Sequence, residues 1–470
     1  MYYGVPRITG GGIDRRIRLS NYILLVESLI FYAFGGIKYL LLIGVVIFIN
    51  WGAGFLCAPN RHSRLVGRLG LIFAVLADMG MLFFFKYFNF FIATIENLLF
   101  PGDLSKAERV TGVFSGVGTG ILGIPEIVLP VGISFFTFQA LSYVIDVYNN
   151  DAELQANLWY FALYISCFPQ LIAGPIVHYK DIATQLSERS VGSYEFAEGI
   201  KRFCFGLAKK VLIANTLASI ADKIWASDLS QLDVTVSWLG AICYTFQIYY
   251  DFSGYSDMAI GLGKMFGFDF KENFNHPYRS ESIQEFWRRW HISLSTWFRD
   301  YVYIPLGGSR HGMGDTCFNI FIVFLLTGIW HGANWNFLVW GLVYGMLLIF
   351  ERLWFGKILA KNPIKFFNRM LIFIVVTLLW VVFRAETIIA AGTFISRMFI
   401  GGFKPLNLLN YLSGMGVIAF VCASIFGGFV QAHMSVKAVK GNMLVCLALL
   451  LLSLLFLVNG TYNPFIYYQF

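Results

Sequence analysis

Long stretches of the chain are apolar and contain no charge at all. Asp, Glu, Lys and Arg are absent from 316–350, 405–436 and 441–470, and the shorter stretches 127–145 and 154–179 also lack them. A helix needs about 20 mainly apolar residues to cross the ~30 Å hydrocarbon layer. A helix also satisfies its own backbone hydrogen bonds there, where lipid offers none. The pattern therefore predicts an all-α membrane protein that crosses the bilayer several times.

The apolar segments follow one another through the chain with few long interruptions. We place them at 20–35, 37–57, 70–98, 127–147, 157–178, 199–225, 236–250, 254–268, 316–329, 335–350, 370–400, 412–431 and 443–459. Because some are too short to cross alone, the pattern predicts about 9 to 12 crossings together with re-entrant pieces. The largest polar connections, 99–126, 180–198 and 269–285, have the length of loops. We therefore expect a single membrane domain over 1–470.

Glycine and proline interrupt two of these segments where an ordinary membrane span would continue. The run 129–132 opens one segment, and the run 168–175 closes another. Backbone groups freed by such breaks need protein or a water-filled cavity as hydrogen-bond partners. A kinked span explains a single break, whereas several breaks together favour an internal cavity.

Composition agrees with the membrane interpretation. Hydrophobic residues make up 57% of the chain and charged residues 13%, against roughly 25% charged in soluble domains. The net charge of +8 could suggest nucleic acid. However, arginines cluster at 7–18 and 61–68, around the first two segments, as expected for basic loops held on the cytoplasmic side. We therefore expect a lipid bilayer and no nucleic acid as partner, with 20–57 as a hairpin.

His331 lies at the middle of the charge-free stretch 316–350, with Gly328 and Gly332 beside it. Ionisable residues inside a membrane are costly, so a functional role is the default hypothesis. Imidazole also has the pKa that suits proton abstraction from a hydroxyl near neutral pH. The alternative is a structural histidine that is hydrogen-bonded between helices at a kink.

His291 lies in a second stretch, 282–301, that has the pattern of an amphipathic helix. Ser282 and Glu285 form a capping-box signature, which predicts that the helix begins there. Apolar residues then recur at helical spacing, namely Phe286, Trp290, Leu294, Trp297 and Tyr301. On such a helix Trp287 and His291 share a neighbouring face.

Arginines at 288 and 289 lie largely off that apolar stripe. Arg288 and Arg289 could hold the phosphates of a soluble cofactor. They could equally meet anionic lipid headgroups, as basic residues of interfacial helices do. The sequence leaves both interpretations open.

A third polar cluster contains Asp251, Tyr255 and Asp257, between the apolar segments 236–250 and 254–268. Two carboxylates six residues apart do not share a helical face, so the pattern gives weak support to a paired acid and base. We expect instead a break in the helix that lines a cavity.

Several chemistries leave no signature in the sequence. There is no cluster of closely spaced histidine pairs, and the seven cysteines show no metal-ligand spacing, so we expect no metal. There is also no phosphate-binding G-x-x-x-x-G-K-[ST] loop and no G-x-S-x-G nucleophile motif. With metal, phosphate-loop and serine-nucleophile chemistry unsupported, a buried histidine that removes a proton is the mechanism that fits the sequence.

Five motifs occur in an order that resembles the membrane-bound O-acyltransferase (MBOAT) family. They are PVGISFFTFQALSYVIDVY at 130–148, FPQLIAGP at 168–175, DFSGYSDMAI at 251–260, EFWRRWHISLSTWFRDY at 285–301 and LTGIWHG at 326–332. Together they cover about 125–350 as the family core. Within the family the chain looks most like the bacterial alginate O-acetyltransferase branch, through 170–176 and 303–308.

The resemblance implies a ring of transmembrane and re-entrant helices around a central pore or funnel. His331 matches the family's invariant histidine and His291 its second histidine, so both are expected to be catalytic. The side chains expected to line the substrate or donor path are Asp251, Tyr255, Asp257, Trp287, Arg288, Arg289, Trp330 and Asn334.

The resemblance also implies reactants, partners and a location. The donor is expected to be acetyl-CoA or another acyl thioester, and the acceptor a polysaccharide. An exported acetylesterase-like partner of SGNH type, in a bacterial cytoplasmic (inner) membrane, is expected to complete the delivery. Members of the branch usually have a further apolar helix before this point, and 1–6 resembles its tail.

The sequence therefore predicts an O-acyltransferase that moves an acetyl group towards a cell-surface or exported polysaccharide. One alternative is a transporter or flippase for a glycan or acyl carrier that performs no chemistry. Another is a D-alanyl-type acyl transfer protein. A scaffold that only docks a partner explains an intramembrane histidine poorly.

Overall fold

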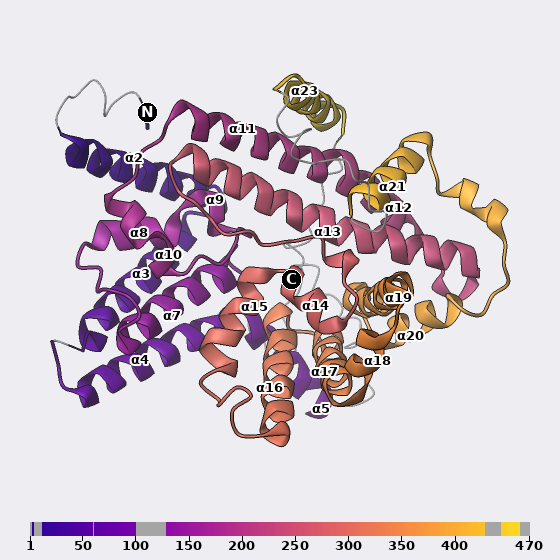
Figure 1. Cartoon of the computed structure of the whole chain (residues 1–470), viewed down its shortest axis with the longest axis horizontal. Coiled ribbons are helices and arrows are strands. Elements are labelled where there is room, and N and C mark those ends of the chain that lie inside the picture. The colour runs from indigo at the N-terminus through magenta and orange to yellow at the C-terminus, as the bar shows by residue number, and fades with distance from the viewer. Residues whose placement is uncertain (1, 4–11, 60, 100–127, 428–442, 461–470) are drawn as a thin grey trace. The chain divides into compact units, whose positions relative to one another are not determined.

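The computed structural model describes residues 2–3, 12–59, 61–99, 128–427 and 443–460. Within these ranges every regular element is a helix (Figure 1), which confirms the predicted all-α class. The expected helix tail at 1–6 and the polar connection 99–126 lie largely outside the described residues.

The chain divides into two compact units. The first unit comprises residues 1–172, 176–189 and 332–334, and the second comprises 173–175, 190–331 and 335–470. The helices of the first are α2 (Ile13–Ala33), α3 (Lys38–Cys57), α4 (Arg64–Leu82), η1 (Phe83–Tyr87), α5 (Phe88–Leu99), α7 (Ile133–Asn149), α8 (Leu158–Ser166), α9 (Phe168–Leu171) and α10 (Tyr179–Ser187).

The second unit carries the remaining helices and both histidines of interest. In chain order they are α11 (Ser193–Ala208), η2 (Lys209–Ala214), α12 (Asn215–Trp225), η3 (Leu229–Gln231), α13 (Val234–Met265), η4 (Pro277–Arg279), α14 (Ile283–Arg289), α15 (Ile292–Phe298), η5 (Arg299–Tyr303), α16 (Met313–His331), α17 (Trp335–Phe350), η6 (Glu351–Phe355), α18 (Gly356–Lys361), α19 (Lys365–Arg384), α20 (Ile388–Arg397), η7 (Pro405–Asn410), α21 (Gly414–Phe426) and α23 (Met443–Asn459).

Six helices in the described part of the chain are long and apolar enough to cross a membrane. They are Lys38–Cys57, Arg64–Ile95, Ser193–Trp225, Met313–His331, Trp335–Lys361 and Lys365–Arg384. Shorter apolar helices follow at Ile388–Arg397, Gly414–Phe426 and Met443–Asn459. The protein is therefore a multi-pass membrane protein, while the number of crossings and the ring around a pore remain predictions.

The break predicted at 129–132 in the first unit is present. Helix α7 begins directly after Gly132, whose φ is 76°. A Cβ at this position would lie 2.6 Å from the carbonyl oxygen of Leu171, so both the left-handed backbone and the close approach require glycine.

The break predicted at Asp251–Asp257 is wrong, because α13 runs through that cluster without interruption. Glycine there serves packing instead. Helices α11 and α13 lie side by side (Figure 1), and a Cβ on Gly206 would come within 2.6 Å of the Gly254 carbonyl oxygen. Small residues let membrane helices approach this closely.

The charge-free stretch 316–350 forms the helix pair α16 and α17, joined by the turn 332–334. The two helices cross where Gly328 faces Gly341, and a Cβ on Gly328 would lie 2.5 Å from the Phe337 carbonyl oxygen. His331 is the last residue of α16. The glycine contact thus fixes the end of the helix that carries this histidine.

Candidate functional site

The helix expected over 282–301 is interrupted at its histidine. Ser282 caps α14 as predicted, accepting the Glu285 N–H at 3.1 Å. The helix ends at Arg289, however, and His291 has the left-handed values φ 43° and ψ 56° before α15 begins. The prediction of one continuous amphipathic helix is therefore wrong, and His291 lies in a bend between two short helices. Such a conformation in a non-glycine residue costs energy and persists only where the surroundings enforce it.

Asn273 supplies the contacts that hold this bend. Its backbone carbonyl accepts the Ile292 N–H at 2.9 Å. Its side-chain Oδ1 accepts the Ser293 N–H at 3.1 Å and the Ser293 hydroxyl at 2.9 Å. The Nδ2 group donates to Ser256 Oγ at 3.2 Å. Asn273 is fully buried, so these bonds form away from water.

The same Asn273 oxygen fixes the tautomer of His291. A backbone N–H can only donate, so the side-chain atom of Asn273 that meets Ser293 N–H must be the carbonyl oxygen. His291 Nδ1 lies 3.2 Å from that oxygen. Because the oxygen only accepts, Nδ1 carries the proton, and Nε2 of the neutral ring holds the lone pair.

Burial keeps His291 neutral. Its side chain is 1% exposed, and desolvation lowers its pKa to about 3, because an imidazolium ion is disfavoured away from water. Phe252 covers the ring edge-on at 4.6 Å between centroids. At neutral pH the residue stays uncharged and can accept a hydrogen bond at Nε2.

His331 is enclosed by aromatic rings. The centroids of Trp340 and Phe383 lie 5.0 and 5.1 Å from that of the imidazole, almost perpendicular to it at 87° and 84°. The imidazole is only 6% exposed. Aromatic walls of this kind hold the ring in one orientation and keep bulk water away.

The structure brings both histidines next to one tryptophan. The Trp330 ring lies 6.1 Å from the His291 ring and 5.0 Å from the His331 ring, measured between centroids. Residues 291 and 331 come from separate elements, the α14–α15 bend and the end of α16. Three of the predicted site residues thus form one cluster.

Two other predicted site residues belong to ion pairs between helices. Asp251 pairs with Lys210 at 2.5 Å, and Asp257 pairs with Lys209 at 2.6 Å and with Arg202. Pairing offsets the cost of burying each charge. It also explains why α13 continues through both carboxylates.

The remaining predicted residues have mixed surroundings. Trp287 is buried in the core against Trp340 and Tyr344. Arg289 pairs with Glu285 within α14 at 2.8 Å, whereas Arg288 is exposed. Tyr255 on α13 is half-buried, and so is Asn334, which lies in the turn after α16.

Sequence reasoning missed Asn273, Trp340 and Phe383. The last two are apolar residues in apolar helices, so no local pattern separates them from lipid-facing neighbours. Asn273 precedes His291 by 18 residues, and its environment depends on a loop fold that periodicity does not encode. Among the described residues no group of three or more His, Cys, Asp or Glu side chains could hold a metal ion.

Comparison with known proteins identifies the family of this chain. The MBOAT family model matches residues 152–390, and the chain belongs to that family of membrane-bound O-acyltransferases. It is 42% identical to the probable alginate O-acetylase of Pseudomonas aeruginosa, over 90% of this chain and 79% of that protein. The predicted family, enzyme class and membrane character are thereby confirmed.

Two further relatives carry related names. The chain is 36% identical to the peptidoglycan O-acetyltransferase of Helicobacter pylori, over 78% of this chain and 71% of that protein. It is 27% identical to the teichoic acid D-alanyltransferase of Bacillus subtilis, over 46% of this chain and 58% of that protein. The O-acetyl-transferring relatives match more of the chain and at higher identity.

Proposed function

We propose that this acyltransferase takes an acetyl group from acetyl-CoA, or a similar thioester, on the cytoplasmic side. It passes the group across the inner membrane towards hydroxyls of a cell-surface polysaccharide. The observation that carries the proposal is the pair of buried histidines around Trp330 in an MBOAT chain. The names of the alginate and peptidoglycan relatives support acetyl as the acyl group and a polysaccharide as the acceptor.

In this proposal His331 is the general base. It removes the proton from an acceptor hydroxyl, whose oxygen attacks the thioester carbonyl carbon. The carbon–sulfur bond breaks, an oxygen ester forms, and the proton passes to the departing thiolate. The acceptor at this step is the polysaccharide or an exported acetylesterase-like partner that relays the group. The helices around the site form the pore through which donor and acceptor meet.

The proposal is tested with purified protein in lipid vesicles, supplied with acetyl-labelled acetyl-CoA. We expect thiol release that depends on an added hydroxyl acceptor, together with label in that acceptor. D-alanyl thioester serves as the competing donor and should react more slowly. Movement of a glycan without thioester cleavage would instead identify a transporter.

His291 supports the same reaction through its neutral ring. With Nδ1–H held by Asn273, its Nε2 is available to accept a hydrogen bond from a reactant during transfer. Asn273 is in this view a positioning residue for His291. Trp330, which contacts both imidazoles, holds the two rings at a fixed separation.

Replacing Asn273 tests that role. We expect Asn273→Ala to lower the transfer rate about tenfold to a hundredfold, part of the 10²–10⁴ that a general acid–base group supplies. In Asn273→Asp the carboxylate still accepts from Nδ1–H but favours the imidazolium. The carboxylate should raise the pKa of His291 from about 3. On acidification the variant should therefore lose activity at a higher pH than the unmodified protein does.

The matched control is Asn275→Ala in the same loop. Asn275 is exposed, and its hydrogen bonds to Arg289 involve its backbone alone. Rate, melting temperature and pH–rate profile are measured for all three variants. If Asn273→Asp lowered the rate but left the acidic side of the pH–rate profile unchanged, Asn273 would act on folding alone.

A further inference from the structure

A pocket of about 500 Å³ lies in the second unit, away from the two histidines. Its walls come from the beginning of α14, the end of α17, η6, α18 and the beginning of α19. Such a volume falls within the range of small-ligand sites, about 300–1,000 Å³. The family's chemistry, as proposed above, does not use it.

Chain connectivity places this pocket at a membrane surface. It is built around the short connection 362–364 between two helices that can cross the membrane, Trp335–Lys361 and Lys365–Arg384. A connection between consecutive spans lies at the edge of the hydrocarbon layer. Between 351 and 369 there are five Lys or Arg residues and a single Glu. By the positive-inside rule this is the cytoplasmic surface.

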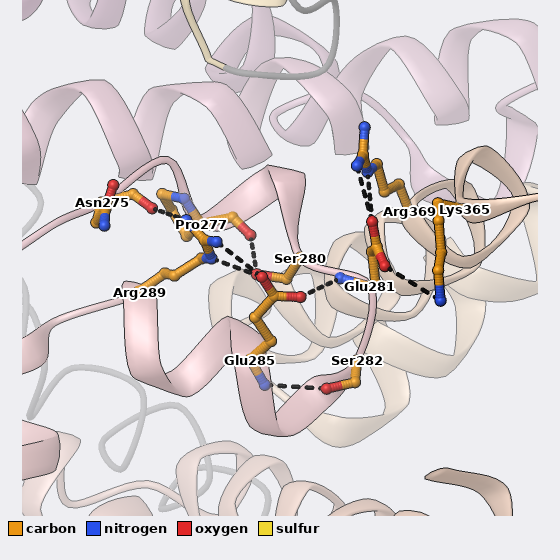
Figure 2. Close-up of polar contacts among 9 residues, drawn as sticks. All are labelled: Asn275, Pro277, Ser280, Glu281, Ser282, Glu285, Arg289, Lys365 and Arg369. Carbon is orange, nitrogen blue, oxygen red and sulfur yellow. Dashed lines mark hydrogen bonds and ion pairs between the residues drawn. The ribbon is translucent and has the colours of Figure 1, made fainter. Parts of the chain in front are cut away.

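Two of the three carboxylates of the pocket, Glu281 and Glu285, are paired with cations. Glu281 pairs with Arg369 at 2.7 Å and with Lys365 at 3.7 Å, the contacts that Figure 2 draws as dashed lines. Glu285 accepts from Arg289 at 2.9 Å and from the Glu281 N–H at 2.8 Å (Figure 2).

Glu351, the third carboxylate, points inward and is only 7% exposed. It accepts the backbone N–H groups of Ile283 and Gln284 at 2.6 and 3.2 Å. These two bonds tie the beginning of η6, directly after α17, to the beginning of α14. All three carboxylates are therefore engaged, two in ion pairs and Glu351 with backbone N–H groups.

Two cationic side chains of the pocket are not in ion pairs within the described part of the chain. Arg352 and Lys357 line the pocket and are exposed, and neither has an ion-pair partner among the described residues. Arg352, Lys357, Lys365 and the ion-pair partners Arg289 and Arg369 outnumber the three carboxylates, so the local potential is positive. The pocket is therefore suited to an anion, and Arg recognises phosphate with several donors at once.

Exposed aromatic and aliphatic side chains lie close in sequence to the same cations. Trp354 is 64% exposed and Phe366 57%, and Ile358 and Phe367 are exposed beside them. Tryptophan at this depth is typical of the boundary between headgroups and hydrocarbon. The region thus offers cations for a phosphate and apolar side chains for acyl chains. A phospholipid has both groups, whereas a soluble phosphate has no acyl chain.

We propose that this pocket binds the phosphate headgroup of an anionic glycerophospholipid from the cytoplasmic leaflet. Arg352 and Lys357 contact the phosphate, and the side chains around Trp354 contact the acyl chains. Because Glu351 joins η6 to α14, the bound lipid steadies the helix that leads to His291. The binding itself is independent of the acyltransferase reaction.

The test measures binding of phosphatidylglycerol to the purified full-length protein by native mass spectrometry and by melting temperature. Phosphatidylcholine serves as the zwitterionic comparison. We expect phosphatidylglycerol to bind more tightly and to raise the melting temperature more. The double variant Arg352→Gln/Lys357→Gln should weaken that binding about tenfold, since each basic residue near a surface contributes to the attraction of anionic lipid.

Lys361→Gln is the matched control, because Lys361 is exposed on α18 but does not line the pocket. It should retain the affinity of the unmodified protein. An equal loss in Lys361→Gln would overturn the proposal in favour of diffuse attraction to the basic surface. Glycerol phosphate that reproduces the full thermal shift would overturn it in favour of a soluble ligand.

Discussion

Replacing His331 by glutamine is expected to lower acetyl transfer about 10²- to 10⁴-fold, the contribution of one general base. Glutamine has nearly the volume of histidine, so the space between Trp340 and Phe383 stays filled. The variant should therefore fold and retain its melting temperature. His331→Ala should lose as much activity, with an additional loss of stability because it leaves a cavity.

The measurement is label transfer from acetyl-CoA in vesicles, at equal amounts of folded protein judged by size-exclusion profile and melting temperature. His311→Ala is the control, because His311 is exposed in the loop before α16. It should transfer at the original rate. A folded His331→Gln protein that kept more than about a tenth of the rate would rule out the general-base role.

Replacing Gly341 by alanine is expected to separate α16 from α17 and to destabilise the protein by about 1–3 kcal/mol, as overpacking does. The added Cβ would collide with the backbone carbonyl oxygen of Phe324 and approach the Gly328 Cα to 2.9 Å. Backbone atoms in a helix cannot turn aside as a flexible side chain can. Because His331 ends α16, the shift should also displace the imidazole and reduce transfer.

Gly314→Ala is the matched control for this packing prediction. Gly314 also lies in α16, but a Cβ there would meet nothing within 4 Å. Its melting temperature should be unchanged or higher, since alanine favours a helix over glycine. If both variants melted alike, close packing at Gly341 would not be what holds the two helices together.

Local sequence patterns were sufficient to predict a helix boundary wherever that boundary depends on neighbouring residues. Ser282 begins α14 because its hydroxyl meets the Glu285 N–H within the same turn. Segment 443–459 coincides with α23, since an apolar run in lipid has to satisfy its backbone internally. His331 could be selected from sequence because placing an ionisable residue inside a membrane costs free energy, so such a residue in a charge-free stretch suggests a function.

Predictions failed where a partner distant in sequence changes the outcome. Asp251 looked like a helix break, but Lys210 on another helix neutralises it and α13 continues. The amphipathic pattern through Trp290 looked continuous, but Asn273 stabilises a left-handed bend at His291. Neither Lys210 nor Asn273 is marked as a partner by any periodicity.

The sequence by itself thus determined the all-α membrane class and the family, and it singled out the two histidines as candidates. The apolar segments could be located because a helix in hydrocarbon needs a long run of apolar residues. The tertiary structure alone decided how His291 is oriented, which aromatic ring contacts both histidines and which charges around the pocket are left unpaired. These depend on directional hydrogen bonds and ion pairs between distant segments, which form only after the helices have packed.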